Sequence, residues 1–61
     1  MKNDDEKSVA WEPTFKVGDQ VVIRRGGAVG KVIDIEWLDE KYLVLIGSGE
    51  WSYGDSELVA L

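Results

Sequence analysis

The sequence predicts an all-β protein, a small five-stranded antiparallel barrel with a one-turn 3₁₀ helix before the last strand. Three observations support this fold class. Short β-branched or alternating apolar runs recur along the chain, glycine-containing turns separate them, and no stretch keeps the apolar period of a helix. With 61 residues, the chain has room for a single domain.

The N-terminal part predicts a tail rather than a strand. Residues 1–12 hold four acidic residues and two lysines without a sustained apolar period, so we expect a flexible acidic tail there and a barrel domain over residues 13–61. The apolar side chains of Val9, Ala10 and Trp11 interrupt this tail. They are expected to pack either on the domain or on a partner.

The first predicted strand spans residues 20–25. Gly18 and Asp19 form a turn signal directly before it, and the strand itself contains a β-branched run. Gly26 and Gly27 follow, and they allow the positive-φ turn that a tight hairpin requires. We therefore expect the chain to reverse at the glycine pair.

The second predicted strand spans residues 29–37. Its second half alternates between two faces, and the apolar members of one face are Ile33, Ile35 and Trp37. Val32 breaks this alternation, which predicts a β-bulge near Gly30. The C-terminal part continues with predicted strands at residues 42–46, 50–53 and 58–61, a glycine turn at 47–49 and the 3₁₀ turn at 54–57.

Charge and missing residue types exclude several functions. Seven basic and twelve acidic residues give a net charge of −5, which disfavours both nucleic acid and an anionic membrane as partners. The chain has no cysteine and no histidine, so we expect no disulfide, no metal site and no cofactor. No spacing assembles a nucleophile with its base, and we assign no catalytic residue. No apolar run reaches the length of a membrane span, so we expect a cytoplasmic protein.

The opening of the predicted domain resembles SH3-like barrels of the KOW and Tudor kind. The residues that carry the resemblance are Phe15-x-x-Gly18-Asp19-x-Val21, then Gly26-Gly27 and Gly30-x-Val32. This similarity implies an SH3-like barrel fold. Among such barrels, the KOW type also implies nucleic-acid binding, which remains an alternative here despite the acidic charge.

A closer resemblance is to the plasmid-borne type B dihydrofolate reductases, which are also SH3-like. Thr14 to Val21, the pair Arg24-Arg25 and the spacing from Tyr53 to Leu58 fall in a similar order. The resemblance implies a homotetramer whose central pore binds folate and NADPH. The family lines that pore with Val-Gln-Ile-Tyr, whereas this chain has Glu-Trp-Ser-Tyr at positions 50–53. A divergent NADPH-dependent reductase is therefore an alternative function, with enzymatic activity left open.

Four aromatic residues form a candidate ligand-binding face, because neighbouring strands lie about 4.8 Å apart and their side chains can converge. These residues are Trp37, Tyr42, Trp51 and Tyr53. Flanking acids such as Glu36, Asp39 and Glu50 suit a cationic ligand or a peptide. The alternative is that some of these aromatics fill the barrel and the others cover its ends. Arg24 is a separate candidate for contact with an anion.

Two predicted strands carry apolar residues on both faces. Either Leu43 and Leu45 or Tyr42, Val44 and Ile46 must face outward, and Val22 lies opposite its neighbours on the first strand. Exposed apolar patches of this kind are typical of interfaces. We therefore expect a non-enzymatic interaction module that forms a dimer or tetramer through Val22, Leu43 and Leu45, and that binds a peptide or protein through the aromatic face.

Overall fold

The computed structural model describes residues 11–61, which form one five-stranded antiparallel sheet and a single 3₁₀ turn. The strands are β1 (Gln20–Ile23), β2 (Val29–Glu36), β3 (Lys41–Ile46), β4 (Gly49–Gly54) and β5 (Leu58–Ala60), and the 3₁₀ turn is η1 (Asp55–Glu57). The predicted all-β class and the 3₁₀ turn before the last strand are confirmed. Apart from its last two residues, the predicted acidic tail lies outside the described residues, as do Val9 and Ala10.

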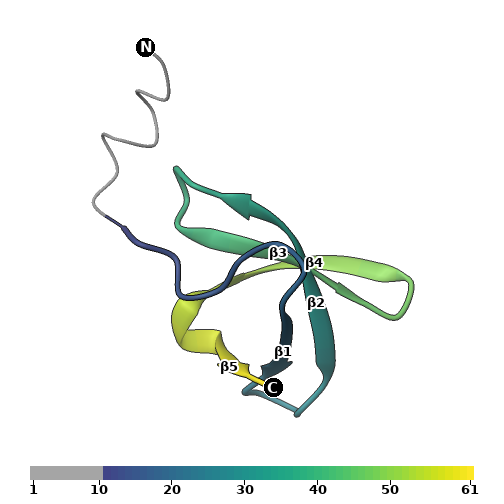
Figure 1. Ribbon diagram of the computed structural model, residues 1–61. Coiled ribbons are helices and arrows are strands. Elements are labelled where there is room, and N and C mark those ends of the chain that lie inside the picture. Colours follow the sequence, from purple (N-terminus) through teal and green to yellow (C-terminus); the bar gives the residue numbers. More distant parts are fainter. Residues whose placement is uncertain (1–10) are drawn as a thin grey trace.

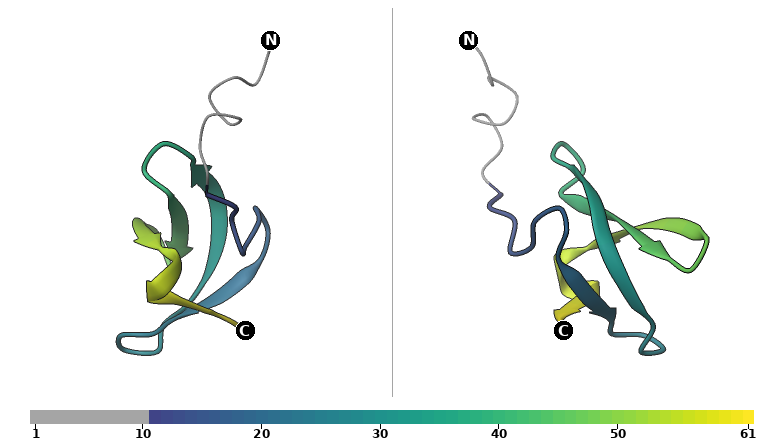
Figure 2. Two further views of the ribbon diagram at one scale, coloured as in Figure 1. Left: turned by 90° about the vertical axis from the view of Figure 1, so that its left-hand side faces the viewer. Right: turned by 45° about the vertical axis from the view of Figure 1, so that its right-hand side comes forward.

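The strands follow the order β4-β3-β2-β1-β5 across the sheet, and each hydrogen-bonded pair is antiparallel. The sheet is strongly curved, so the tips of the β1–β2 and β3–β4 hairpins point in different directions (Figures 1 and 2). It does not close into the expected barrel, because β4 and β5 remain its two edges. An edge strand leaves part of its main chain without a partner strand.

Glycines make the hairpin turns that the sequence predicts. Gly26 and Gly27 have φ angles of 95° and 77° between β1 and β2, and Gly47 has a φ of 61° between β3 and β4. These positive angles strain most other residues. The N–H of Gly27 donates to the carbonyl of Ile23 over 3.0 Å, so β1 ends at Ile23 and the following two arginines lie in the turn.

The expected β-bulge occurs three residues later than predicted. The pairing of β2 with β3 shifts register between Val32 and Asp34, and the N–H of Ile35 donates to Asp34 Oδ1 over 2.8 Å. Val32 consequently lies opposite Val44, and Ile35 lies opposite Tyr42. Val44 and Tyr42 are the two fully buried residues of β3. Val32 and Ile35 therefore share one face of the sheet although they are three positions apart in β2, where a regular strand would need two. This shift explains why Val32 breaks the alternation. It also leaves Ile33 without a partner in the register.

Gly30 has a different role from the predicted one. It is buried, and a Cβ atom at this position would lie 2.5 Å from Val44 Cγ1 and 2.9 Å from the carbonyl oxygen of Leu45. Gly30 therefore permits the close approach of β2 and β3 rather than forming a bulge.

The core lies on the concave side of the sheet and contains residues from the loop before β1 and from four strands. Its buried members are Phe15, Val21, Ile23, Val32, Tyr42, Val44 and Leu58. Tyr42 and Val44 are fully buried, so β3 turns Leu43 and Leu45 toward the opposite face. This settles which of the two alternatives for β3 applies.

Candidate functional site

Tyr42 belongs to the core and is inaccessible to a ligand, with 0% of its surface exposed. Its hydroxyl donates to Asp55 Oδ1 over 2.6 Å and accepts from the backbone N–H groups of Thr14 (2.9 Å) and Phe15 (3.3 Å). Burial, and next the hydrogen bond to Asp55, raise the pKa of Tyr42 above its ordinary value. The Tyr42 hydroxyl thus ties the segment before β1 to the end of β4, and Tyr42 is removed from the predicted aromatic face.

Trp11 packs on the domain. Its indole Nε1 donates to Asp55 Oδ2 over 2.7 Å, and its ring meets those of Tyr42 and Trp37 edge-on at centroid distances of 5.4 and 5.9 Å. Trp37 is half-buried, and this packing accounts for it. Of the two alternatives for the Trp11 side chain, docking on the domain is the one found.

Asp55 joins Trp11 to Tyr42, a role that the sequence analysis did not predict. Its two carboxylate oxygens accept hydrogen bonds from Tyr42 and Trp11, which lie 13 and 44 positions away. The η1 turn holds it in place, and the N–H of Gly54 donates to Glu57 Oε1 across the same turn over 2.8 Å. No local pattern encodes such a separation, so an aspartate at the start of a 3₁₀ turn indicates only a local capping residue.

Trp51 and Tyr53 lie on the concave face of β4, opposite Val44 and Tyr42 in the register. Because β4 is an edge strand, Trp51 remains 51% exposed, while Tyr53 is half-buried against the core. The Trp51 indole covers Gly49, where a Cβ atom would overlap the ring. Of the four predicted aromatics, Trp51 is thus the one that offers an open surface.

Arg24 is exposed at the start of the β1–β2 turn and lies beside Tyr53 at a hollow of about 330 Å³. The hollow is lined by Ile23, Arg24, Arg25, Tyr53, Ser56 and Glu57. The backbone N–H of Arg24 donates to the carbonyl of Glu57 over 2.9 Å, which joins the turn to η1. Arg24 and Tyr53, which the sequence analysis assigned to separate sites, therefore line the same hollow.

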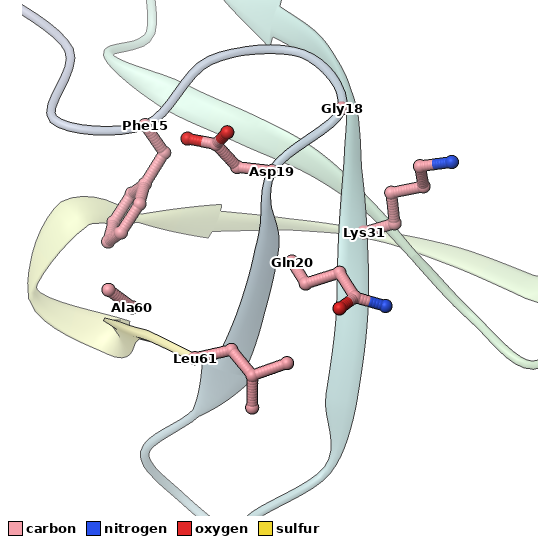
Figure 3. Close-up of a pocket in the computed structure, with 7 residues that line it drawn as sticks. All are labelled: Phe15, Gly18, Asp19, Gln20, Lys31, Ala60 and Leu61. Carbon is pink, nitrogen blue, oxygen red and sulfur yellow. The ribbon is translucent and has the colours of Figure 1, made fainter.

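A second hollow of about 520 Å³ lies where the start of β1 meets β5 (Figure 3). It is lined by Phe15, Gly18, Asp19, Gln20, Lys31, Ala60 and Leu61. Figure 3 shows the Lys31 side chain extending away from the Phe15 ring. The two charged side chains that line this hollow, Asp19 and Lys31, differ in sign. They do not form a nucleophile–base pair or a set of metal ligands.

The predicted interface residues share the convex face of the sheet. Val22, Leu43 and Leu45 are half-buried and point away from the core. Val22 pairs with Val29 of β2 and Val59 of β5, which are 50% and 40% exposed. A row of three valines therefore crosses three neighbouring strands on this face. We call these five residues the convex apolar face.

Two further properties hold for residues 11–61. No group of three or more histidine, cysteine, aspartate or glutamate side chains in this part of the chain is arranged to hold a metal ion. Within the same range, no helix has the length and apolar character needed to cross a membrane.

Comparison with known protein families identifies the family of this domain. Residues 18–61 match the YodN N-terminal domain family. The chain belongs to this family. The residues shared with the YodN N-terminal domain include all five strands and η1, and Trp11 and Thr14 precede them.

No curated protein and no solved structure matches the chain. The resemblance to type B dihydrofolate reductases therefore has no support beyond the residues that suggested it. The name of the YodN N-terminal domain family specifies no activity or ligand.

Proposed function

We propose that this YodN N-terminal domain is a non-enzymatic interaction module that self-associates through its convex apolar face. The observation that carries the proposal is the common orientation of Val22, Leu43 and Leu45 away from the core. Val22 also lies beside the exposed Val29 and Val59. Clustered apolar side chains on a surface are typical of interfaces. A sheet face of this kind can pack on the same face of a second copy by twofold symmetry.

The magnitude of apolar burial supports an assembly. Covering roughly 400 Å² of apolar surface on each chain contributes about 10 kcal/mol per chain at about 25 cal/mol/Å². The loss of translational and rotational freedom on association costs about 4–15 kcal/mol. The burial of the two chains together is thus large enough to offset that cost, and a dimer or tetramer is the expected state.

The finer fold assignment is also part of the proposal. We propose that the curved sheet is an SH3-like fold of the KOW and Tudor kind. The strand order β4-β3-β2-β1-β5, with a 3₁₀ turn between β4 and β5, supports it. A cytoplasmic location fits the absence of cysteine, which secreted domains of this size commonly use in disulfides.

The experiment compares the oligomeric state of the parent protein with that of two variants, a triple variant of the convex apolar face and a double variant that serves as the control. The face variant carries Val22→Thr, Leu43→Thr and Leu45→Thr, which keep strand-compatible side chains while adding hydroxyls and, at the leucines, reducing apolar volume. The control variant carries Val17→Thr and Leu38→Thr, which change exposed apolar residues outside the sheet (59% and 75% exposed). Sedimentation equilibrium at micromolar concentration measures the mass of each.

We expect the parent and the control variant to sediment as dimers or tetramers and the face variant as a monomer. A parent protein that remains monomeric across this concentration range contradicts self-association. A face variant that assembles as well as the parent contradicts the assignment of the interface to the convex face.

A further inference from the structure

The β4 edge has main-chain groups that point away from the sheet. A two-residue turn at Gly47 and Ser48 joins β3 to β4, and the flanking pair in such a hairpin exchanges both hydrogen bonds. Hydrogen-bonded pairs then alternate along the ladder, so Trp51 bonds to Val44. The N–H and C=O groups of Glu50 and Ser52 consequently face away from β3.

The two faces of this edge differ chemically. On the convex side, Glu50 is exposed, and the hydroxyl of Ser52 donates to Glu36 Oε1 over 3.1 Å. The Glu50 carboxylate therefore lies on the edge strand itself, and the Glu36 carboxylate reaches this strand from β2, across β3. On the concave side, Trp51 is half-exposed and lies over the backbone of Gly49. An added strand would therefore meet carboxylates on one face and an indole ring on the other.

We propose that β4 binds an extended segment of a partner protein as an additional strand, and that this segment alternates basic, apolar and basic residues. Side chains of directly opposite residues lie on the same face of a sheet. The two basic residues would lie opposite Glu50 and Ser52, within reach of the Glu50 and Glu36 carboxylates. The apolar residue between them would cover Trp51. Main-chain hydrogen bonds supply affinity in this mode, and the alternate side chains supply specificity.

Charge favours a basic partner over a second copy of this chain. Pairing β4 with β4 of another copy would bring Glu50 and Glu36 of both chains close together, and each chain has a net charge of −5. A basic segment instead neutralises both carboxylates, and the net negative charge increases its rate of encounter. This inference extends the proposed role as an interaction module, but it uses the β4 edge rather than the convex apolar face.

The other edge of the sheet provides a matched control. β5 contains three residues, which is too short for an extended pairing. The N–H of Leu61 donates to the carbonyl of Gln20, so the N–H of Ala60, one residue earlier, points away from β1. A proline at Ala60 removes a free edge N–H in the same way as a proline at Ser52, and neither change removes a ladder hydrogen bond.

The probe is a capped Lys-Val-Lys-Val-Lys peptide, titrated to millimolar concentration against the full chain and followed by amide chemical shifts. A capped Glu-Val-Glu-Val-Glu peptide is the charge control. We expect the largest shifts at the amides of Glu50 and Ser52. We expect roughly three- to tenfold weaker binding at about 1 M salt, because salt screens the charge attraction.

Four variants test the mechanism. Ser52→Pro should abolish binding, whereas Ala60→Pro should leave it unchanged. Glu50→Lys should weaken binding at least as much as high salt does, whereas Asp39→Lys, which changes an exposed acid in the β2–β3 turn, should change it less than twofold.

Several results would overturn the inference. These are an absence of shifts at millimolar peptide, equal binding of the acidic peptide, shifts centred on the hollow beside Arg24, or unchanged binding by Ser52→Pro. The same titration on the face variant separates this inference from the proposed self-association. The face variant retains the β4 edge, so a monomeric face variant that still binds the peptide supports both proposals. A face variant that still assembles and still binds the peptide contradicts only the convex interface. A parent protein that assembles but does not bind the peptide contradicts only the β4 site.

Discussion

The two ends of the β3–β4 hairpin use aromatic residues in opposite ways. Near the base of the hairpin, Trp11 and Tyr42 pack edge-on and direct their polar atoms to the carboxylate of Asp55. Nearer the tip, Trp51 is half-exposed, and the main-chain groups beside it have no partner strand within the part of the chain that the structure describes. We call the first region the clamp and the second the β4 edge.

The difference indicates which polar groups are satisfied between distant segments of the domain and which main-chain groups lie at an edge of the sheet. Hydrogen bonds in the clamp are shielded and join residues far apart in the chain, so breaking one leaves other groups without a partner. At the β4 edge, the outward main-chain groups have no partner strand among residues 11–61, so a change there has little to disrupt. Matched substitutions in the two regions test this difference.

The largest expected effect is at Tyr42. Tyr42→Phe leaves Asp55 and two backbone N–H groups without the hydroxyl, and it should lower the free energy of unfolding by about 2–3 kcal/mol. Tyr53→Phe is the control, because the Tyr53 hydroxyl forms no hydrogen bond within the described part of the chain. It should cost less than about 0.5 kcal/mol. Urea unfolding measures both, and equal losses would contradict the special role of the clamp.

A smaller effect is expected at the two tryptophans. Trp11→Phe keeps an aromatic ring but removes the hydrogen bond to Asp55, which should cost about 1.5 kcal/mol, a value typical of a bond to a charged group. Trp51→Phe should cost less than about 0.5 kcal/mol, because the ring is half-exposed. Thermal and urea unfolding provide the comparison. A larger loss at Trp51 than at Trp11 would reverse the assignment of the two regions.

The smallest expected effect is a pH dependence above the ordinary pKa of tyrosine, about 10. Burial and the bond to Asp55 raise the pKa of Tyr42 in the folded state, so folding favours its protonated form. The resulting stabilisation is complete below the unfolded-state pKa and is lost as pH rises through the folded-state pKa.

Urea unfolding at a series of alkaline pH values, with tyrosinate absorbance as a second signal, measures this loss. Tyr42→Phe should show a shallower alkaline decline than the parent. Identical declines in the parent and Tyr42→Phe would show that Tyr42 does not contribute.

Much of the strand and turn pattern could be predicted from sequence, because its determinants are local. The glycine pair at residues 26–27 and Gly47 mark turns wherever a positive φ is required. The break in alternation at Val32 correctly indicated a bulge in the second strand. Its position was wrong, because Gly30 turned out to serve the close contact with β3.

The candidate site was less predictable from sequence. Trp37, Tyr42, Trp51 and Tyr53 were expected on one ligand-binding face, yet Tyr42 is buried and Trp37 packs against Trp11. An apolar run such as that of β3 has no polar side to mark its outer face, so the sequence could not choose between its two faces. Nor could it show which strand lies at an edge, and this decides whether Trp51 is exposed.

The sequence by itself determined the all-β class, the number of strands, the glycine turns and the 3₁₀ turn, because backbone preference and side-chain alternation act over a few neighbouring residues. Only the tertiary structure decided that Tyr42 faces inward, that Asp55 joins it to Trp11, and that β4 is an open edge. Each of these depends on contacts between segments that are distant in the chain. Their pairing is set by how the whole sheet buries its apolar surface and satisfies its polar groups.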